Sequence, residues 1–282
     1  IFQLSNNEQI TLIAGTTQTG EIDRLYRFSG PDYEIAPSSV AIDKWNSQTY
    51  YYNENATITG DLRGNIGSYF KAGSVYASYF SYSGSSGNMI SKYPLIFQNS
   101  LDANSNFTTK AVMIYRVATL YLRYAEAVNR IGKPNLAFAV LKYGMNPEEL
   151  ALDSIVPRHE KYSVYTDSTG SFIDYVNFSN IAFEQNIGVH ARGCGNANRG
   201  TDFIIPSLNT LQDSVNFVED KIIEELALET AFEGNRFQDL MRIAIRRNNP
   251  AFLADKIAAK HTVNEQAIRS KLMDENNWYL KK

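Results

Sequence analysis

Apolar residues recur every three or four positions through the last quarter of the chain, which is the spacing that one face of an α-helix produces. The first stripe consists of Val215, Val218, Ile222, Ile223, Leu226, Ala227, Ala231 and Phe232. The second consists of Phe237, Leu240, Met241, Ala244 and Ile245. The two stripes predict two amphipathic helices that meet at Gly234 and pack against each other and against a further layer.

Short signals mark where these two helices begin and end. Thr210 and Asp213 have the spacing of a capping box, which predicts the start of the first helix. Gly234 stands where the end of a helix favours a left-handed residue, and Asn235 can cap the helix that follows. We therefore expect a break in the helix between residues 229 and 240.

Acidic residues are frequent on the first of these helices. They are Glu224, Glu225, Glu229 and Glu233. We interpret them as solvated helix surface that forms salt bridges with Lys221 and Arg236, because exposed helical acids are common. Arg236 is expected to pair with Glu229 or Glu233. A glycosidase needs two carboxylates that flank a sugar from different directions, and acids on one helix do not provide this arrangement, so we expect no enzyme.

A second helical pattern begins at Lys110. Its apolar positions are Val112, Ile114, Val117, Ala118, Tyr121, Leu122, Ala125 and Val128. Gly132 and Pro134 stop this helix, and a second helix follows from Asn135. The spacing matches one tetratricopeptide unit, and such units need about three copies to be stable. We therefore expect further helical partners.

The remaining segments have loop character. Ile10–Ile13 is a short β-branched run that predicts a strand. In Gly188–Gly200, four glycines let the backbone approach its own helices or a ligand closely. The predicted fold is mainly α, with tetratricopeptide-like helical hairpins, long ordered loops and minor β. We expect one domain over residues 1–282. Its parts are a loop-rich region 1–110, a helical hairpin 111–145, a loop region 146–209 and C-terminal helices 210–282.

Composition narrows the class of protein. The 282 residues are 44% hydrophobic and 20% charged, as in ordinary globular chains. The net charge of −3 argues against nucleic acid as a partner, because binding phosphates requires a basic surface. No apolar run has the length of a membrane-spanning helix. The single cysteine, Cys194, excludes an internal disulfide framework.

Metal ligands are sparse, so we expect neither a metal nor another cofactor. His159, His190 and His261 are scattered. His190 and Cys194 lie four residues apart in a predicted loop, without a third ligand nearby, and Cys194 is interpreted as a packing residue. The run from Asp102 starts like a calcium loop but lacks the glycine and the bidentate glutamate of such a loop.

Aromatic residues are numerous, with 18 Tyr and 15 Phe, and several lie among Ser, Gly and Asn in the first 110 residues. We predict a ligand-binding platform formed by Trp45, Tyr50, Tyr51, Tyr76, Tyr79 and Tyr82. Such rings supply a large contact area, and their polar tips bind hydroxyls. The alternative is that these rings pack the loops onto the helical body.

Four segments together resemble the SusD/RagB family, the cell-surface nutrient-binding lipoproteins of Bacteroidetes. They are GDLRGN at Gly60–Asn65, YLRYAEAVNRIGKPNLA at Tyr121–Ala137, ELALETAFEGNRFQDLMRIA at residues 225–244 and DENNWYL at Asp274–Leu280. The resemblance implies a SusD-like fold with loop insertions that form the ligand face. It also implies a lipid anchor in the outer membrane and a SusC-like TonB-dependent transporter as partner.

On this resemblance we expect a non-catalytic protein that captures a glycan, or less often a peptide, at the cell surface and delivers it to the transporter. Because the chain begins at Ile1, we expect it to be the C-terminal portion of a longer protein whose signal peptide, N-terminal lipid anchor and further repeats are absent here. The alternative from another class is a helical-repeat scaffold that binds protein partners.

Overall fold

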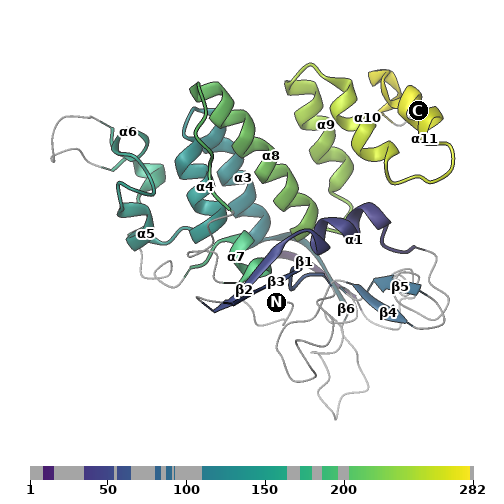
Figure 1. Ribbon diagram of the computed structural model, residues 1–282, viewed down its shortest axis with the longest axis horizontal. Helices are drawn as coiled ribbons and strands as arrows, with labels where there is room; N and C mark the ends of the chain where they lie inside the picture. Colours follow the sequence, from purple (N-terminus) through teal and green to yellow (C-terminus); the bar gives the residue numbers. More distant parts are fainter. Residues whose placement is uncertain are drawn as a thin grey trace, which may run out of the picture.

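The computed structural model describes residues 9–15, 35–53, 56–64, 80–83, 87–90, 92, 110–163, 172–179, 186–195 and 203–279. Over these residues the chain is mainly helical with little strand, which confirms the predicted fold class. In Figure 1 the longer helices stand side by side above the strands.

The longer helices form the body of the molecule. They are α3 (Val117–Arg130), α4 (Pro134–Tyr143), α8 (Leu211–Glu229), α9 (Arg236–Arg246), α10 (Pro250–Ala258) and α11 (Glu265–Leu272). Helices α3 and α4 form the predicted hairpin, and α8 packs against both of them. Helix α9 returns from α8, α10 packs on α9 and α11 packs on α10, so the row extends to the C-terminus (Figure 1).

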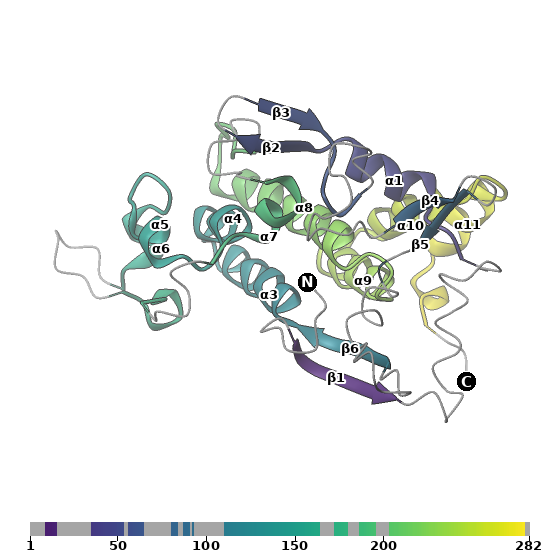
Figure 2. The same ribbon diagram turned by 90° about the horizontal axis from the view of Figure 1, so that it is seen from below.

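Other helices of the described residues lie around this body, and most of them are shorter. They are α1 (Ser39–Asn46), α5 (Pro147–Ala151), α6 (Arg158–Lys161), α7 (Val189–Cys194) and the 3-10 helices η3 (Asp174–Val176) and η6 (Glu275–Asn277). Helix α1 contacts α8 and runs beneath the helical row (Figure 1). In Figure 2 it lies between the pair of strands labelled β2 and β3 and the pair labelled β4 and β5. Helix α7 packs between α4 and strand β2 (Thr49–Asn53).

Within the described residues, the strands pair as three separate antiparallel two-stranded sheets. They are β1 (Gln9–Gly15) with β6 (Lys110–Arg116), β2 with β3 (Ala56–Thr59), and β4 (Phe80–Ser83) with β5 (Gly87–Ile90). The first pairing sets Gly15 opposite Lys110, so the two ends of a long segment meet. In the second, Tyr50 lies opposite Ile58.

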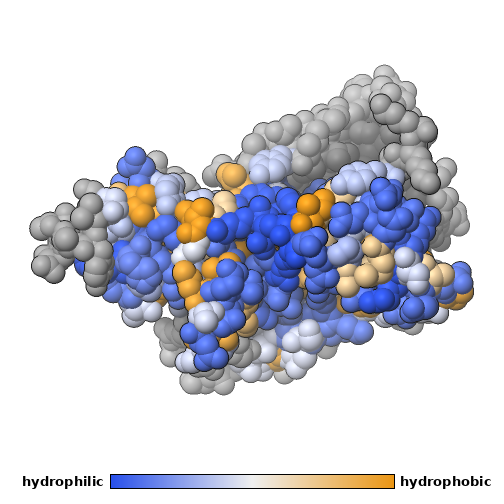
Figure 3. Space-filling model, turned by 90° about the horizontal axis from the view of Figure 1, so that it is seen from above, coloured by the Kyte–Doolittle hydropathy of each residue, from blue (hydrophilic) through white to orange (hydrophobic). Residues whose placement is uncertain are grey.

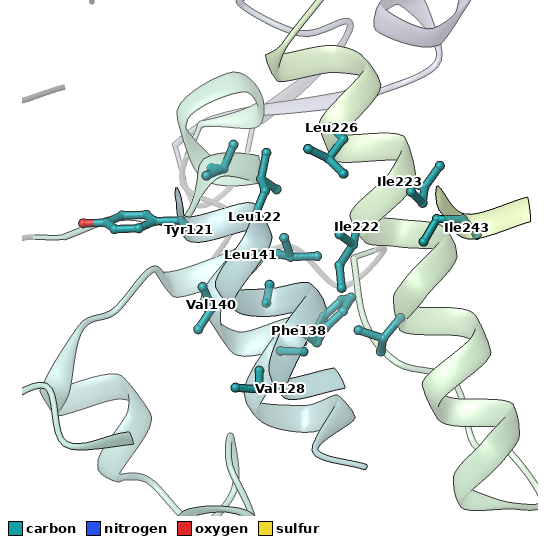
Figure 4. Packing of buried hydrophobic residues seen from close by; sticks show 14 of the residues in the cluster. Tyr121, Leu122, Val128, Phe138, Val140, Leu141, Ile222, Ile223, Leu226 and Ile243 are labelled. Carbon is teal, nitrogen blue, oxygen red and sulfur yellow. The ribbon is translucent and has the colours of Figure 1, made fainter. Parts of the chain in front are cut away.

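The apolar core lies where α3, α4, α8 and α9 face one another. Leu122, Leu141, Ile222, Leu226 and Ile243 are among its fully buried residues. In Figure 4 the first four lie between the α3–α4 hairpin and α8, and Ile243 lies beside Ile223. Seen from above, the surface over the helix ends is mainly hydrophilic with scattered hydrophobic residues (Figure 3). This distribution is expected of amphipathic helices whose apolar stripes face inward.

Most of the predicted helix signals are confirmed. The capping box forms, since the Thr210 side chain accepts from the Asp213 backbone and the Asp213 carboxylate accepts from the Thr210 backbone. The chain breaks after α8 as predicted, with left-handed backbone at Gly234 (φ 81°) and also at Phe232 (φ 67°). Asn235 occupies the cap position of α9, but its side chain makes no capping hydrogen bond. The predicted strand around Ile10–Ile13 is β1.

The helix predicted from Lys110 begins only at Val117. The seven residues before it form β6, which pairs with β1. The run KAVMIYR is rich in residues that favour strands, and its pairing with a distant segment overrides the helical spacing that continues into α3. The predicted tetratricopeptide-like hairpin is therefore confirmed from Val117 onward, in α3 and α4.

We predict that Gly234→Ala lowers the free energy of unfolding by about 1 kcal/mol or more, because alanine is strained at positive φ. A Cβ atom at Gly234 would meet no heavy atom within 4 Å, so the loss would come from the backbone alone. Urea denaturation measures it. Asn235→Ala is the matched control and should change the value by less than about 0.5 kcal/mol. Equal effects of the two substitutions would contradict the prediction.

Candidate functional site

A cluster of charged side chains lies buried below the end of α8. We call it the charge cluster, and its members are Asp61, Arg63, Lys92, Arg116, His190, Glu225, Glu229 and Glu233. They come from five segments. These are the turn after β3, position 92 shortly after β5, the last residue of β6, helix α7, and α8 with the turn that follows it. Of these side chains only that of Glu233 is more than slightly exposed, at 15%.

Arg63 stands at the centre of one half of the cluster. Its Nε and Nη2 atoms donate to the two carboxylate oxygens of Asp61 at 2.9 and 2.7 Å. Its Nη1 atom donates to Glu225 at 2.5 Å and to Glu229 at 3.0 Å. The guanidinium lies directly against α7, where a Cβ atom at Gly193 would come within 2.4 Å of it. Glycine at position 193 therefore allows the arginine to reach α8.

Arg116 and Lys92 hold the other half. Arg116 donates to the Glu229 carboxylate at 2.5 Å, to the Glu229 carbonyl at 2.6 Å and to Glu233 at 2.7 Å. Lys92 donates to the Glu229 carbonyl at 2.8 Å and to Glu233 at 2.5 Å. The carbonyl of Glu229 belongs to the last turn of α8, whose carbonyls have no partner within the helix. The two cations thus cap the C-terminal end of α8 and also neutralise its acids.

The electrostatics keep the carboxyl groups of Glu225, Glu229 and Glu233 ionised. Burial alone would raise the pKa of Glu229, but Arg116, Arg63 and Lys92 outweigh it and hold that pKa below its usual value. The same balance lowers the pKa of Glu225, with Arg63 and His190 as the opposing groups. Burial lowers the pKa of Lys92 to about 8, although Glu233 opposes this shift.

A polar pocket of about 320 Å³ opens beside the cluster, between α1, α7 and α8. Its lining residues are Lys44, Ser47, Gln48, Thr49, His190, Phe203, Lys221, Glu224, Glu225 and Leu228. Two of them, His190 and Glu225, also belong to the charge cluster. The buried part of the pocket wall is therefore held in place by the ion pairs beneath it.

One wall of the pocket carries stacked rings. The His190 ring lies on the Phe203 ring, with centroids 3.6 Å apart and planes 7° apart. Phe203 stacks in turn on Phe138 of the core, at 4.6 Å. The Nδ1 atom of His190 lies 3.0 Å from the Glu225 carboxylate. The imidazole is thus fixed in orientation from its face and from its edge.

The opposite, solvent-facing side is formed by an ion pair on α8. Lys221 donates to Glu224 at 2.9 Å, and both side chains are partly exposed. Together with Gln48, Ser47 and Thr49, this pair places donors and acceptors around the opening. Such a pocket can hydrogen-bond a ligand rich in hydroxyl groups and offers it one aromatic wall.

Two rings of the predicted aromatic platform are buried. Trp45 is 1% exposed, so its predicted exposure is wrong, and Tyr50 is 8% exposed, so it is not one of the exposed tyrosines that the platform requires. Trp45 packs on Phe232, with ring centroids 5.9 Å apart, and against Gly64. Tyr51 is half-buried on β2, beside Gly195. Tyr76 and Tyr79 lie outside the described residues, as does the side chain of Tyr82, whose backbone is in β4.

The interpretation of the helical acids as solvated surface is correct only for Glu224, which pairs with Lys221. Glu225 and Glu229 are each 2% exposed and take their cations from distant segments. The predicted pairing of Arg236 with Glu229 or Glu233 is also wrong. Arg236 instead donates to the carbonyl of Ile223 at 2.9 Å, because Arg63, Arg116 and Lys92 already occupy both acids.

His190 and Cys194 lie on helix α7 and not in a loop. Cys194 is fully buried against Asp61, and burial raises the pKa of its thiol, in agreement with its interpretation as a packing residue. Within the described ranges no group of three His, Cys, Asp or Glu side chains could hold a metal ion. None of the described helices is long and apolar enough to cross a membrane.

Sequence reasoning missed the pocket itself. The signal nearest to it was the glycine-rich segment Gly188–Gly200, where close backbone approach was expected; Gly193 and Gly195 do lie against Arg63 and Tyr51. Lys44 and Phe203 carried no signal, because each lies in a segment without a distinctive motif.

Comparison with known families gives one match. The SusD family model matches residues 26–144. This range contains α1, the Asp61–Arg63 turn, Arg116, and the α3–α4 hairpin, and thus two of the four segments on which the resemblance rests. No curated protein and no solved structure matches the chain. The match supports membership of the SusD/RagB family.

We predict that Glu229→Gln lowers the free energy of unfolding by about 3–5 kcal/mol, because it leaves Arg116 and Arg63 buried without full compensation. Glu224→Gln, on the same helix and in an exposed pair, should lower it by less than about 1 kcal/mol. Chemical denaturation of both variants measures the difference. Similar losses in both would show that the charge cluster is not a main source of stability.

The lowered pKa values of Glu225, Glu229 and Glu233 predict acid sensitivity. Their folded-state pKa values lie below the ordinary 4.5, so the unfolded chain binds more protons in that window. The contribution of these carboxylates to the free energy of unfolding should therefore be complete above about pH 4.5. It should decrease as the pH falls below that value. Urea midpoints measured from neutral to acidic pH test this. In Glu233→Gln the urea midpoint should decrease less steeply as the pH falls. An unchanged slope in this variant would contradict the prediction.

Proposed function

We propose, from the match of residues 26–144 to the SusD family model, that this chain captures an oligosaccharide nutrient and delivers it to a SusC-like TonB-dependent transporter. The family implies nutrient or glycan binding at the cell surface and association with the outer membrane. Delivery to the transporter, the lipid anchor and the choice of a glycan over a peptide are parts of the proposal.

The observation that carries the proposal is the polar pocket between α1, α7 and α8. Its volume of about 320 Å³ lies at the lower end of the range for small-ligand sites. Charged and amide side chains surround the opening, and the stacked pair of His190 and Phe203 forms one wall. A sugar unit presents hydroxyl groups around its edge, and the polar side chains of this lining are complementary to them.

The pocket acids favour binding over catalysis. A glycosidase uses one protonated and one ionised carboxyl group on opposite sides of the scissile bond. Glu225 is held ionised by Arg63 and cannot serve as the acid, and its neighbour Glu224 lies on the same helix and pairs with Lys221. Members of the SusD/RagB family are generally non-catalytic binding proteins. We therefore propose that no bond of the ligand is broken here.

The structure also changes the proposed ligand face. With Trp45 and Tyr50 buried, we propose that binding uses the rim of the polar pocket and not the predicted aromatic platform. Tyr51 is half-buried on β2, near the Thr49 end of the pocket, and its role in binding stays a prediction.

The test is calorimetry of the purified chain with a panel of neutral and acidic oligosaccharides and a peptide mixture. For the tightest oligosaccharide we expect Lys221→Ala and Glu224→Ala each to weaken binding about tenfold, since a hydrogen bond to a charged group contributes about 1.5–3 kcal/mol. Asp220→Ala is the matched control, because Asp220 is exposed on the same helix, pairs with Arg247 and does not line the pocket.

Unchanged affinity in both pocket variants, with melting temperatures equal to that of the parent chain, would remove the pocket as the site. Preferential binding of peptides would replace the glycan by a peptide nutrient. Release of reducing sugar from a bound oligosaccharide, abolished by substitution of one acid, would contradict the absence of catalysis.

A further inference from the structure

A second cavity lies on the other side of α1 and has a different character. It has a volume of about 470 Å³ and runs between α1, the end of α8 and α10. Short side chains from each of these elements leave it open: Ala41 from α1, Ala227 and Ala231 from the end of α8, and Ala259 from the end of α10. Trp45 and Phe232 close its inner side. We call this cavity the apolar groove.

The charged groups around the apolar groove are mostly basic. Lys44, Arg236, Lys256 and Lys260 line it, and Asp255 is the one acid among its lining residues. Asp255 is already paired with Arg269 at 2.6 Å. In the part of the chain that the structure describes, none of the four basic groups forms an ion pair with a carboxylate. Arg236 donates instead to the carbonyl of Ile223.

Arg236 and Lys256 both act on Lys44, where Glu224 opposes them, and Arg236 acts on Lys260. Burial lowers the pKa of Arg236 to about 10. Burial also lowers the pKa of Lys44 and of Lys260, and the charge of Arg236 contributes to both shifts. A negative charge placed among these groups would relieve this repulsion, so the groove is complementary to an anion in charge and to a hydrocarbon in lining.

The walls decide what kind of anion fits. They are formed mainly by the helices α1, α8 and α10, whose internal main-chain groups are already hydrogen-bonded within the helix, together with residues just outside the helix ends such as Ala231 and Ala259. An extended peptide in the apolar groove would bury amide groups without partners, at about 1–3 kcal/mol for each. A sugar would bury hydroxyl groups against alanine and aromatic side chains, which cannot bond them. A single alkyl chain brings no such groups, and the volume lies within the range of small-ligand sites.

We propose that the apolar groove binds a single-chain carboxylate, a fatty-acid anion, with its alkyl chain against the alanines and its carboxylate among the basic groups of the lining, which include Lys44 and Lys260. This site is separate from the polar pocket and does not depend on the function proposed for that pocket. Lys44 lines both cavities, whereas Lys260 lines only the apolar groove. A substitution of Lys260 therefore tests binding in the apolar groove without changing the lining of the polar pocket.

The test is calorimetry of the whole chain with dodecanoate below its micelle concentration. We expect saturable binding, and Lys260→Met and Lys44→Met should each weaken it about tenfold, because methionine keeps the apolar stem and removes the charge. Neither lysine forms an ion pair with a carboxylate among the described residues, so both variants should fold and melt close to the parent chain. Lys271→Met, an exposed lysine on α11 that lines neither cavity, is the matched control.

Two further measurements separate the contributions of charge and shape. Dodecanol, which has the same chain without the charge, should bind weakly and with no sensitivity to Lys260→Met. Ala259→Trp should block dodecanoate by filling the groove from an exposed position, while oligosaccharide binding stays unchanged.

The proposal would be overturned by an absence of dodecanoate binding, by equal affinity for dodecanol, or by unchanged affinity in both lysine variants. Competition by a hydrophobic peptide with a free C-terminal carboxylate, at higher affinity than dodecanoate, would also overturn it and assign the groove to a peptide.

Discussion

The buried charge cluster is the interaction on which the placement of the loop-rich segments depends. The apolar core consists of described residues from Ala118 onward, so the segments before β6 share little of it. They are fastened instead by Arg63, Lys92 and Arg116, which reach the end of α8 from three separate segments. A buried charge costs several kcal/mol unless it is paired. If one of these segments moved away, a buried charge on α8 would lose its partner at that cost. The ion pairs therefore favour one position for each segment.

The helical body could be predicted because its signals are local. The apolar stripes of α8 and α9, the capping box at Thr210 and the left-handed residue at Gly234 each depend on neighbours within a few positions. The start of α3 could not be predicted in this way, because β6 exists through its pairing with β1, roughly a hundred residues earlier in the chain. When a sequence pattern is compatible with both a strand and a helix, pairing with another strand determines which one forms. The local sequence does not show whether such a partner strand exists.

The charge cluster and the aromatic rings were misjudged for a related reason. Glu225 and Glu229 lie four positions apart on one face of α8, and that spacing is the same whether the face meets water or arginine. Their cations lie more than a hundred residues away in the sequence. Trp45 is equally ambiguous, because an aromatic ring among loops supplies area for a ligand or for packing. The structure assigns it to packing, since Phe232 and Gly64 cover it.

The charge cluster also determines what the polar pocket can do. A carboxylate that is surrounded by cations remains ionised, and it is then an acceptor of hydrogen bonds and a poor source of protons. Glu225 is in this state, and the imidazole of His190 is fixed between it and Phe203. The inner wall of the pocket is thus rigid before a ligand arrives, whereas Lys221 and Glu224 at the rim are partly exposed and can adjust. A rigid wall limits the entropy lost on binding, and an adjustable rim tolerates variation in the ligand. This combination agrees with the proposed capture of related oligosaccharides, in which a ligand is bound and released without cleavage.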